Sequence, residues 1–289
     1  YALSPEYATI AAVTRDDMVA WHKQYVQPNN IILGIVGDFD SNEMERKLRD
    51  AFASWPRGPG AADPRIAFTP AKPGYYFVNK SDVNQSSVRM LGEGTTKQDP
   101  DFYAIEVFNE AFGGGFSSRL FRDLRTTKAL AYSVGGGIGT RFDHPGVLQL
   151  AIGTKSESTV EAIRGLYQEV EDLKTKPLDE QEIKQAKDSI LNSFIFNFDT
   201  PDKVLRERMA YEFYRYPPDF LERYRAGIEK VQPGDVARVA ARFILDKHLP
   251  VLVVGNSAEF DKPLSSLGPV TTLDIAIPPP PAEPKTGGQ

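Results

Sequence analysis

The stretch GGGFSSRLFRDLRTTKALAY, from Gly113 to Tyr132, decides how this sequence is interpreted. Three consecutive glycines follow a helical pattern that is expected to end at Phe112, and a strand is expected to open at Tyr132 after a short amphipathic segment. Within this stretch Arg125 and Tyr132 lie seven residues apart. Because a guanidinium and a phenol can both donate to one carbonyl oxygen, and glycine leaves the backbone uncovered, the layout suits binding of a peptide backbone.

The stretch resembles the second domain of the M16 zinc metallopeptidases, the family of insulin-degrading enzyme, pitrilysin and the mitochondrial processing peptidases. The family pattern reads roughly G-G-x-x-S-R-L-F-x-x-L-R-x-x-x-x-x-x-Y. The positions that match it here are Gly114, Gly115, Ser118, Arg119, Leu120, Phe121, Leu124, Arg125 and Tyr132. One departure is Ala129, where many relatives carry glycine, and it bears on the local backbone conformation.

The resemblance implies roles for residues in and beside the stretch. Arg125 and Tyr132 are expected to hold the substrate carbonyl near the scissile bond. The expected substrate-facing residues around them are Gly113, Gly114, Gly115, Phe116 and Ser133. Without the resemblance, an arginine here is ordinarily a solvated surface charge, a tyrosine at a strand start is half-buried packing, and the glycines form a helix C-cap.

Composition narrows the class of protein. The chain has 289 residues, 41% of them hydrophobic and 25% charged, which is ordinary for one large or two modest globular domains. A net charge of -5 argues against a nucleic-acid partner, which requires a basic surface. Apolar runs near 18 residues are absent from the sequence, so no membrane span is expected.

Metal-binding residues are scarce in this sequence. It contains no cysteine, which excludes disulfides and thiolate metal sites. Its three histidines are His22, His144 and His248, and neither H-E-x-x-H nor H-x-x-E-H occurs. We therefore expect no metal site in this chain. In the M16 family the zinc motif lies in the first domain, so the resemblance places zinc in an N-terminal part that this sequence does not contain.

Two segments resemble each other at a constant offset of 218 residues. TRDDMVAWHKQYVQPNNIILGIVGD, from Thr14 to Asp38, aligns without gaps to QPGDVARVAARFILDKHLPVLVVGN, from Gln232 to Asn256. Each reads as an N-capped helix, a turn and an apolar strand ending in glycine. Such units recur in many folds, but a gapless match of this length favours a duplication. The first copy would then be the end of a domain that has lost most of its N-terminal part.

The domain organisation follows from the repeat and the linker composition. We expect a remnant of the first M16-type domain over 1–56, a linker over 57–73, a complete second domain over 74–275 and a proline-rich tail over 276–289. The remnant should contain a helix from Asp16 to Val26, a strand from Ile31 to Val36, and a helix capped by Ser41.

The expected fold class is α+β, a mainly antiparallel sheet with helices packed on one face, as in the M16 metallopeptidases. The elements should be strands at 75–78 and 85–91 as partners, a helix from Asp99, a hairpin over 131–153, helices at 158–175, 179–198, 220–229 and 234–244 with another from Pro201, and a closing strand at 251–254. The acidic residues around Glu169 and Glu182 are expected to be solvated helix faces.

The hypothesis that explains most residues is a C-terminal part of an M16-like zinc endopeptidase. The implied partners are a peptide or unfolded polypeptide substrate and a zinc-bearing M16 domain, in cis or in trans. This chain alone is expected to be inactive. The alternatives are a non-catalytic M16-like partner subunit or peptide-binding scaffold, and an unrelated ferredoxin-like binding domain. The proline-rich tail and the resemblance to bacterial two-domain members favour an extracytoplasmic, periplasmic location, with a cytoplasmic one as the alternative.

Overall fold

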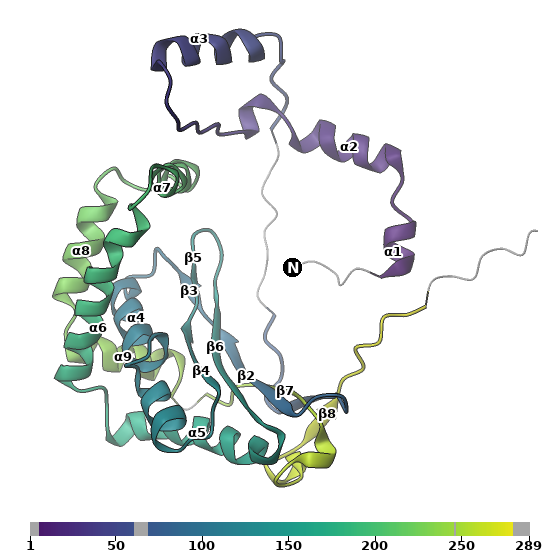
Figure 1. Ribbon diagram of the computed structural model, residues 1–289, viewed down its shortest axis with the longest axis vertical. Helices are drawn as coiled ribbons and strands as arrows, with labels where there is room; N and C mark the ends of the chain where they lie inside the picture. The colour runs from purple at the N-terminus through teal and green to yellow at the C-terminus, as the bar shows by residue number, and fades with distance from the viewer. Residues whose placement is uncertain (1–5, 61–68, 246, 280–289) are drawn as a thin grey trace, which may run out of the picture. The chain divides into compact units, whose positions relative to one another are not determined.

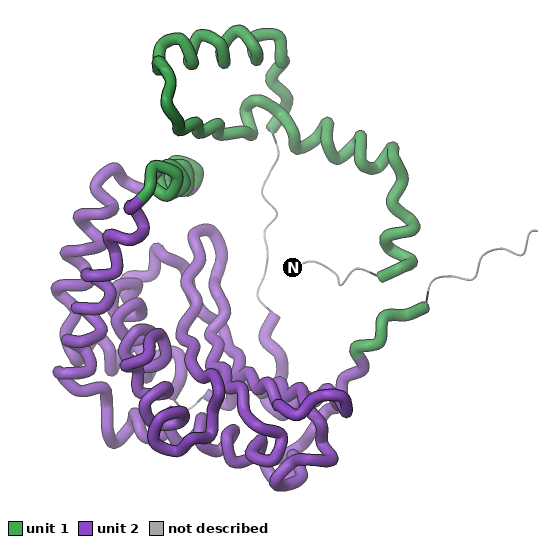
Figure 2. Tube along the Cα trace, viewed as in Figure 1, with its two compact units in different colours: residues 1–67, 200–213, 275–289 green, residues 68–199, 214–274 purple. Residues whose placement is uncertain are grey.

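The computed structural model describes residues 6–60, 69–245 and 247–279 of the chain. They divide into two compact units, which are coloured separately in Figure 2. The first unit comprises the described residues of 1–67, 200–213 and 275–289, and the second those of 68–199 and 214–274.

The second unit is built on a six-stranded sheet with the strand order β4-β6-β2-β7-β1-β8 (Figure 1). Three of its neighbouring pairs are antiparallel, and the two pairs that involve β1 are parallel. A separate two-stranded sheet joins β3 to β5. The strands are β1 (Tyr75–Asn79), β2 (Gln85–Glu93), β3 (Thr95–Thr96), β4 (Ser133–Ile138), β5 (Thr140–Arg141), β6 (Val147–Lys155), β7 (Val251–Gly255) and β8 (Val270–Thr272).

Helices cover one face of this sheet (Figure 1). The alternation along β6 shows which face, because Leu148, Leu150 and Ile152 are buried while Gln149 and Ala151 between them are partly exposed. The helices of this unit are α4 (Phe102–Asn109), α5 (Thr159–Thr175), α6 (Glu180–Ser193), α8 (Phe220–Lys230) and α9 (Pro233–Phe243). The predicted α+β class with a mainly antiparallel sheet is confirmed.

Strand order differs from the sequence prediction at two points. The strands β1 and β2 are not partners, because β7 lies between them, parallel to β1 and antiparallel to β2. Val251 and Val253 of β7 are fully buried, as suits a short, continuously apolar strand in the interior of a sheet. It does not close the sheet either: β8 follows it in the chain, and its three residues are too short to give a periodic signal.

The first unit consists of helices among its described residues. They are α1 (Tyr7–Ala11), α2 (Arg15–Tyr25), α3 (Ser41–Phe52) and α7 (Pro201–Phe213). The strand predicted over 31–36 is wrong: the backbone there has no ladder partner among the described residues, and a strand needs one. Asp40, not Ser41, caps α3, since its carboxylate accepts from the backbone N–H of Glu43 at 2.8 Å.

The structure describes only parts of the predicted linker and of the predicted tail. Residues 61–68 of the predicted linker and 280–289 of the predicted tail lie outside the described residues. Helix α7, expected in the second domain, groups with the first unit instead. Its Leu205 and Met209 lie against Gly34, where an added Cβ would be 2.4 Å from the Met209 sulfur. The domain limits therefore remain a prediction.

A carboxylate network fastens α9 to the start of α4. Arg242 forms a bidentate pair with Asp99 through N···O distances of 2.8 and 2.9 Å, and Thr95 donates to the same carboxylate at 2.7 Å. Burial alone would raise the pKa of Asp99, but the hydrogen bonds from Arg242 and Thr95 outweigh it and lower the pKa from 3.8 to about 2. The folded state therefore favours the ionised carboxylate.

The network gives a pH-dependent stability. A depressed pKa contributes stability that is present above the unfolded pKa of 3.8 and lost as the pH falls towards 2. We expect Asp99→Asn to cost about 1–2 kcal/mol in urea unfolding at pH 5.5, below the value the shift implies because the half-exposed Arg242 is screened by solvent. Near pH 2 the same substitution should cost almost nothing. A cost independent of pH would contradict the assignment.

Candidate functional site

The stretch from Gly113 to Tyr132 begins in one π-helical turn of the second unit and contains a second one. Helix α4 ends at Asn109 and continues directly as the π-helical turn η2 (Glu110–Gly114), so the helical backbone runs past Phe112 into the first two glycines. A second π-helical turn, η3 (Phe121–Thr127), carries Arg125. π-Turns insert an extra residue into a helix and occur frequently at functional sites, so both turns indicate a candidate site in this stretch.

Gly113 is buried and allows the helix end to contact strand β4. A Cβ added to it would lie 2.5 Å from the Gly136 carbonyl oxygen, and one added to Gly135 would lie 2.5 Å from the Gly113 carbonyl oxygen. Such approaches exclude any side chain on either glycine. The close backbone approach inferred from these glycines is therefore made by the chain to itself. Gly114 is exposed and Gly115 half-buried.

Asn109 covers part of the free edge of the sheet. Strand β4 pairs only with β6 in the sheet order, so its other side is an edge. The Asn109 amide donates to the Ile138 carbonyl at 2.9 Å and accepts from the Ile138 N–H at 2.7 Å. This contact imitates a strand partner at the C-terminal end of β4. The N-terminal end of β4, where Tyr132 and the exposed Ser133 lie, is not covered by it.

Arg125 is exposed and held by aromatic packing. Its guanidinium carbon lies 4.7 Å from the centroid of the Phe121 ring, and Phe121 packs edge-on against Phe116 at 5.1 Å between centroids. Among the described residues no hydrogen bond or ion pair uses the Arg125 guanidinium. The stacking restricts the side chain while its five N–H donors stay available. Phe116 itself is 83% exposed.

Tyr132 immediately precedes β4, so the strand begins one residue later than predicted. Its backbone N–H donates to the Gly153 carbonyl at 2.8 Å, which ties it to the end of β6. The residue is 50% exposed, and its hydroxyl has no hydrogen-bond partner in the described part of the chain. A phenol donor on a fixed backbone at the end of β4 that Asn109 does not cover could reach a polypeptide ligand.

A buried ion pair anchors the stretch to α6. Arg119 is 7% exposed, and it donates to Glu182 and to the carbonyl oxygens of Lys176 at 2.6 Å and Pro177 at 3.1 Å. Burial works to raise the pKa of Glu182, but hydrogen bonds from Arg119 and the Asp179 N–H outweigh it and leave the pKa lowered. The prediction that Glu182 belongs to a solvated helix face is therefore wrong.

A second anchor holds the other end of η3. Lys128 donates to the carboxylate of Glu169 on α5 at 2.8 Å, and Glu169 is only 3% exposed. The prediction of a solvated face is wrong here too. Burial raises the pKa of Glu169, with Lys128 opposing the effect. Arg125 thus lies between two anchored residues, Arg119 and Lys128. The sequence around Arg125 does not predict either ion pair.

Ala129 forms the turn between η3 and β4. Its φ of 52° lies in the left-handed region, and the following N–H of Leu130 closes the helix end by donating to the Leu124 carbonyl at 2.9 Å. This conformation is typical of a glycine at a helix C-terminus. The departure from the family pattern at Ala129 therefore falls on a residue with positive φ.

Replacing Ala129 by glycine should stabilise the second unit. A left-handed residue with a Cβ costs roughly 1–2 kcal/mol, and glycine loses about 0.5–1 kcal/mol more chain entropy on folding. We expect Ala129→Gly to raise the free energy of unfolding by about 0.5–1 kcal/mol in urea titrations. Ala131→Gly, two residues along at a position without positive φ, is the control and should be destabilising. Equal effects of the two variants would contradict the assignment.

A groove lies beside the stretch. Its volume is about 390 Å³, and it runs between the end of the glycine segment, η3 and the start of α6. It is lined by Phe116, Ser117, Arg122, Thr126, Asp179, Gln181, Glu182 and Gln185. Thr126, which follows Arg125, therefore lines a concave surface that carries both positive and negative side chains.

The residues described do not form a metal site. No group of three His, Cys, Asp or Glu side chains that could hold a metal ion occurs among them. His144 pairs with the neighbouring Asp143 at 2.7 Å, His22 lies on α2, and His248 precedes β7. Zinc does not fit this part of the chain. Within the same residues, none of the helices is both long and apolar enough to cross a membrane.

One protein-family model and several known proteins match the sequence of this chain. The family model described as "Peptidase M16 inactive domain" matches residues 12–190. A probable inactive metalloprotease of Bacillus subtilis is 26% identical over 253 residues, covering 85% of this chain and 57% of that protein. An uncharacterized zinc protease of Streptomyces coelicolor is 24% identical, covering 86% and 54%. The chain thus spans just over half the length of these relatives.

Solved structures agree at the level of fold. The crystal structure of a peptidase M16 inactive domain from Pseudomonas fluorescens superposes with a TM-score of 0.75 at 19% identity, covering 89% of this chain and 60% of that one. A protease from Helicobacter pylori gives a TM-score of 0.72 at 21% identity, covering 86% and 60%.

Proposed function

The chain belongs to the peptidase M16 family, whose inactive domain it matches, and we propose that it is the zinc-free half of a peptide-degrading shell. Membership of this class implies pairing with a catalytic M16 domain, and zinc belongs to the family through that domain. The proposal assigns to this half the enclosure of a peptide or unfolded polypeptide and the binding of its backbone.

The observation that carries the proposal is the pair of unused donors at Arg125 and Tyr132. One is fixed by stacking on Phe121 and the other by the backbone contact with Gly153, and both are exposed. Fixed donors favour a developing oxyanion because little reorganisation is needed during the reaction. We assign both donors to the scissile carbonyl oxygen, with the zinc-bearing domain activating the water that attacks it.

The uncovered end of β4 supports a second part of the proposal. A peptide could add to a sheet edge through main-chain hydrogen bonds, and the Asn109 contact confines that addition to the end of β4 near Tyr132. Gly114, Phe116 and Ser133 are exposed and could contact such a peptide, whereas buried Gly113 serves the contact with β4. Peptide turnover by variants at Arg125 and Tyr132, assayed together with a zinc-bearing partner domain, is the direct test of this proposal.

By itself the chain should not cleave peptides. Zinc and an unstructured fluorogenic peptide added to the 289-residue chain are expected to give no turnover above buffer, because the described residues contain no metal-binding group. The assay needs an intact M16 zinc peptidase as its positive control. Cleavage by this chain that a chelator abolishes would contradict the proposal. An extracytoplasmic location remains a prediction from the proline-rich tail and the resemblance to bacterial members.

A second candidate function is non-catalytic peptide binding. The name of the Bacillus subtilis relative, a probable inactive metalloprotease, favours it. The two candidates share the surface around Arg125 and differ only in whether the partner domain carries a zinc site. Identification of H-x-x-E-H in that partner would decide for the peptidase.

A further inference from the structure

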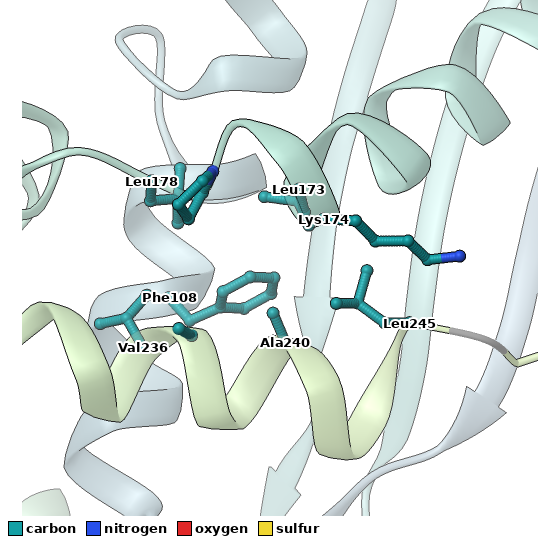
Figure 3. Close-up of a pocket in the computed structure, with 9 residues that line it drawn as sticks. Phe108, Leu173, Lys174, Leu178, Val236, Ala240 and Leu245 are labelled. Atoms are coloured by element: carbon teal, nitrogen blue, oxygen red, sulfur yellow. The ribbon is translucent and has the colours of Figure 1, made fainter.

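A cavity of about 240 Å³ lies between three helices of the second unit, α4, α5 and α9 (Figure 3). Phe108 of α4 lines it together with Val236 and Ala240 of α9, and all three residues are buried. Leu173 at the end of α5 and Leu178 in the connection to α6 add aliphatic side chains from the opposite wall. The interior surface of the cavity is therefore hydrocarbon.

The cavity offers no charge to a ligand. Among its described lining residues Lys174 alone is charged, and its ammonium donates to Glu171 at 2.7 Å. Figure 3 shows the Lys174 side chain extending away from Phe108. A charged ligand would be buried without a partner, which is strongly unfavourable. The lining thus selects an uncharged, apolar molecule.

Polar contacts outside the cavity keep its walls in place. The carboxylate network described above fastens α9 to the start of α4. On the other side, Arg119 holds the connection between α5 and α6 by donating to the carbonyl oxygens of Lys176 and Pro177. Because both walls are fixed, neighbouring side chains cannot collapse into the space, and the cavity is already formed without a ligand.

The size of the cavity suits a single ring system. An apolar cavity of about 150 Å³ stays dry and binds benzene. This one is larger, so it has room for a substituted benzene or a bicyclic ring. Ala237, which is exposed, lies at the rim beside Lys174 and leaves a path of entry from solvent.

We propose that this cavity binds one small uncharged aromatic or alicyclic molecule of about 7–10 heavy atoms, and that binding stabilises the anchor of the stretch carrying Arg125. Pro177 lines the cavity while its carbonyl oxygen accepts from Arg119 at 3.1 Å. Leu178, also in the lining, directly precedes Asp179, the N-cap of α6. A ligand that packs on both residues restrains the segment that holds Arg119.

This inference goes beyond the proposed function and does not rest on it. The cavity is lined by none of the residues to which that function assigns a role. Binding can therefore be measured on the 289-residue chain alone, without a zinc-bearing partner or a peptide. Failure of the peptide assay would leave the cavity site standing, and failure of the binding assay would leave the proposed function standing.

The test compares two probes of similar size by ¹⁹F NMR, 4-fluorotoluene and 4-fluorobenzoate. We expect 4-fluorotoluene to bind saturably with a dissociation constant of roughly 0.1–1 mM, as suits a ligand with few atoms. The benzoate should bind at least about 100-fold more weakly, because its carboxylate would be buried unpaired. Equal binding of the two probes, or no saturable binding of 4-fluorotoluene, would overturn the proposal.

Substitutions on α9 locate the bound probe. Ala240→Leu fills the cavity and should weaken 4-fluorotoluene binding at least about 10-fold. The matched control Ala241→Leu makes the same change at the next residue, which is exposed, and should alter affinity less than about 2-fold. If circular dichroism shows Ala240→Leu unfolded, Leu245→Phe at a half-buried lining position replaces it. A folded filling variant that binds as tightly as the unmodified chain would refute the site.

Amide hydrogen exchange tests the effect on the anchor. At a 4-fluorotoluene concentration threefold above its dissociation constant, exchange of the Lys176 and Asp179 amides should slow by about 4-fold, since openings that disrupt the cavity become rarer. Amides of α3 in the first unit are the control and should not change. The slowing should disappear in the filling variant. Binding that leaves the Lys176 and Asp179 amides unaffected would contradict the stabilisation of the anchor.

Discussion

Replacing Glu182 by alanine is expected to lower the free energy of unfolding of the second unit by about 3–5 kcal/mol. The substitution leaves Arg119 with a buried guanidinium that has lost its counter-ion, because the two side chains are only 9% and 10% exposed. The cost exceeds the net strength of the pair, since an uncompensated charge remains in the interior. It also removes the capping contact from the Asp179 N–H at 3.0 Å.

A matched control lies on the same helix. Asp188 pairs with Lys184 on the surface of α6, where the side chains are 52% and 75% exposed. Asp188→Ala should cost less than about 0.5 kcal/mol. Urea unfolding followed by circular dichroism measures both variants. If Glu182→Ala and Asp188→Ala differ by less than about 1 kcal/mol, the ion pair is not the anchor of the stretch.

The second large effect concerns turnover. If the chain pairs with a zinc-bearing domain as proposed, Arg125→Ala in that complex is expected to lower kcat/KM for an unstructured peptide by about 10²–10³-fold, the usual loss when one oxyanion donor is removed. Arg125→Lys should recover little, because an ammonium has neither the planar fork nor the stacking geometry on Phe121. The reduction should fall mainly on kcat, since the interaction strengthens in the transition state.

A suitable control removes an arginine without removing a donor to the substrate. Arg225 lies on α8 in a surface pair with Glu229, 74% exposed, and Arg225→Ala should leave kcat/KM within about 2-fold. Should Arg125→Ala behave like Arg225→Ala, the residue is an ordinary surface charge that packs on an aromatic ring.

The sequence was most informative where local chemistry determines structure. The N-capped helices predicted over 16–26 and 234–244 are present as α2 and α9, each beginning one residue earlier. The helix predicted over 179–198 begins close to its predicted start as α6 but ends at Ser193. Local sequence could not decide whether residues 31–36 form a strand. A strand forms only with a neighbouring strand, and the described part of this unit supplies none. The position of β7 between β1 and β2 likewise depends on contacts distant in sequence.

In the candidate site, too, the sequence predicted some residues and missed others. The family pattern marked Arg125 and Tyr132, and the glycine missing at Ala129 proved to be a residue with positive φ. The anchors Glu182 and Glu169 were missed because their burial depends on partners 63 and 41 residues away. Asn109 was missed because an amide that covers a strand edge has no sequence signature beyond its place on the helix face.

The central claim is that one guanidinium and one phenol donate to the same substrate oxygen, and a double-mutant cycle on peptide turnover tests it most directly. Tyr132→Phe and Arg125→Ala should each lower kcat/KM, and the double variant should lose less than the product of the two, with a coupling of about 0.5–3 kcal/mol. If either single variant turns over peptide at the unmodified rate, the claim is wrong.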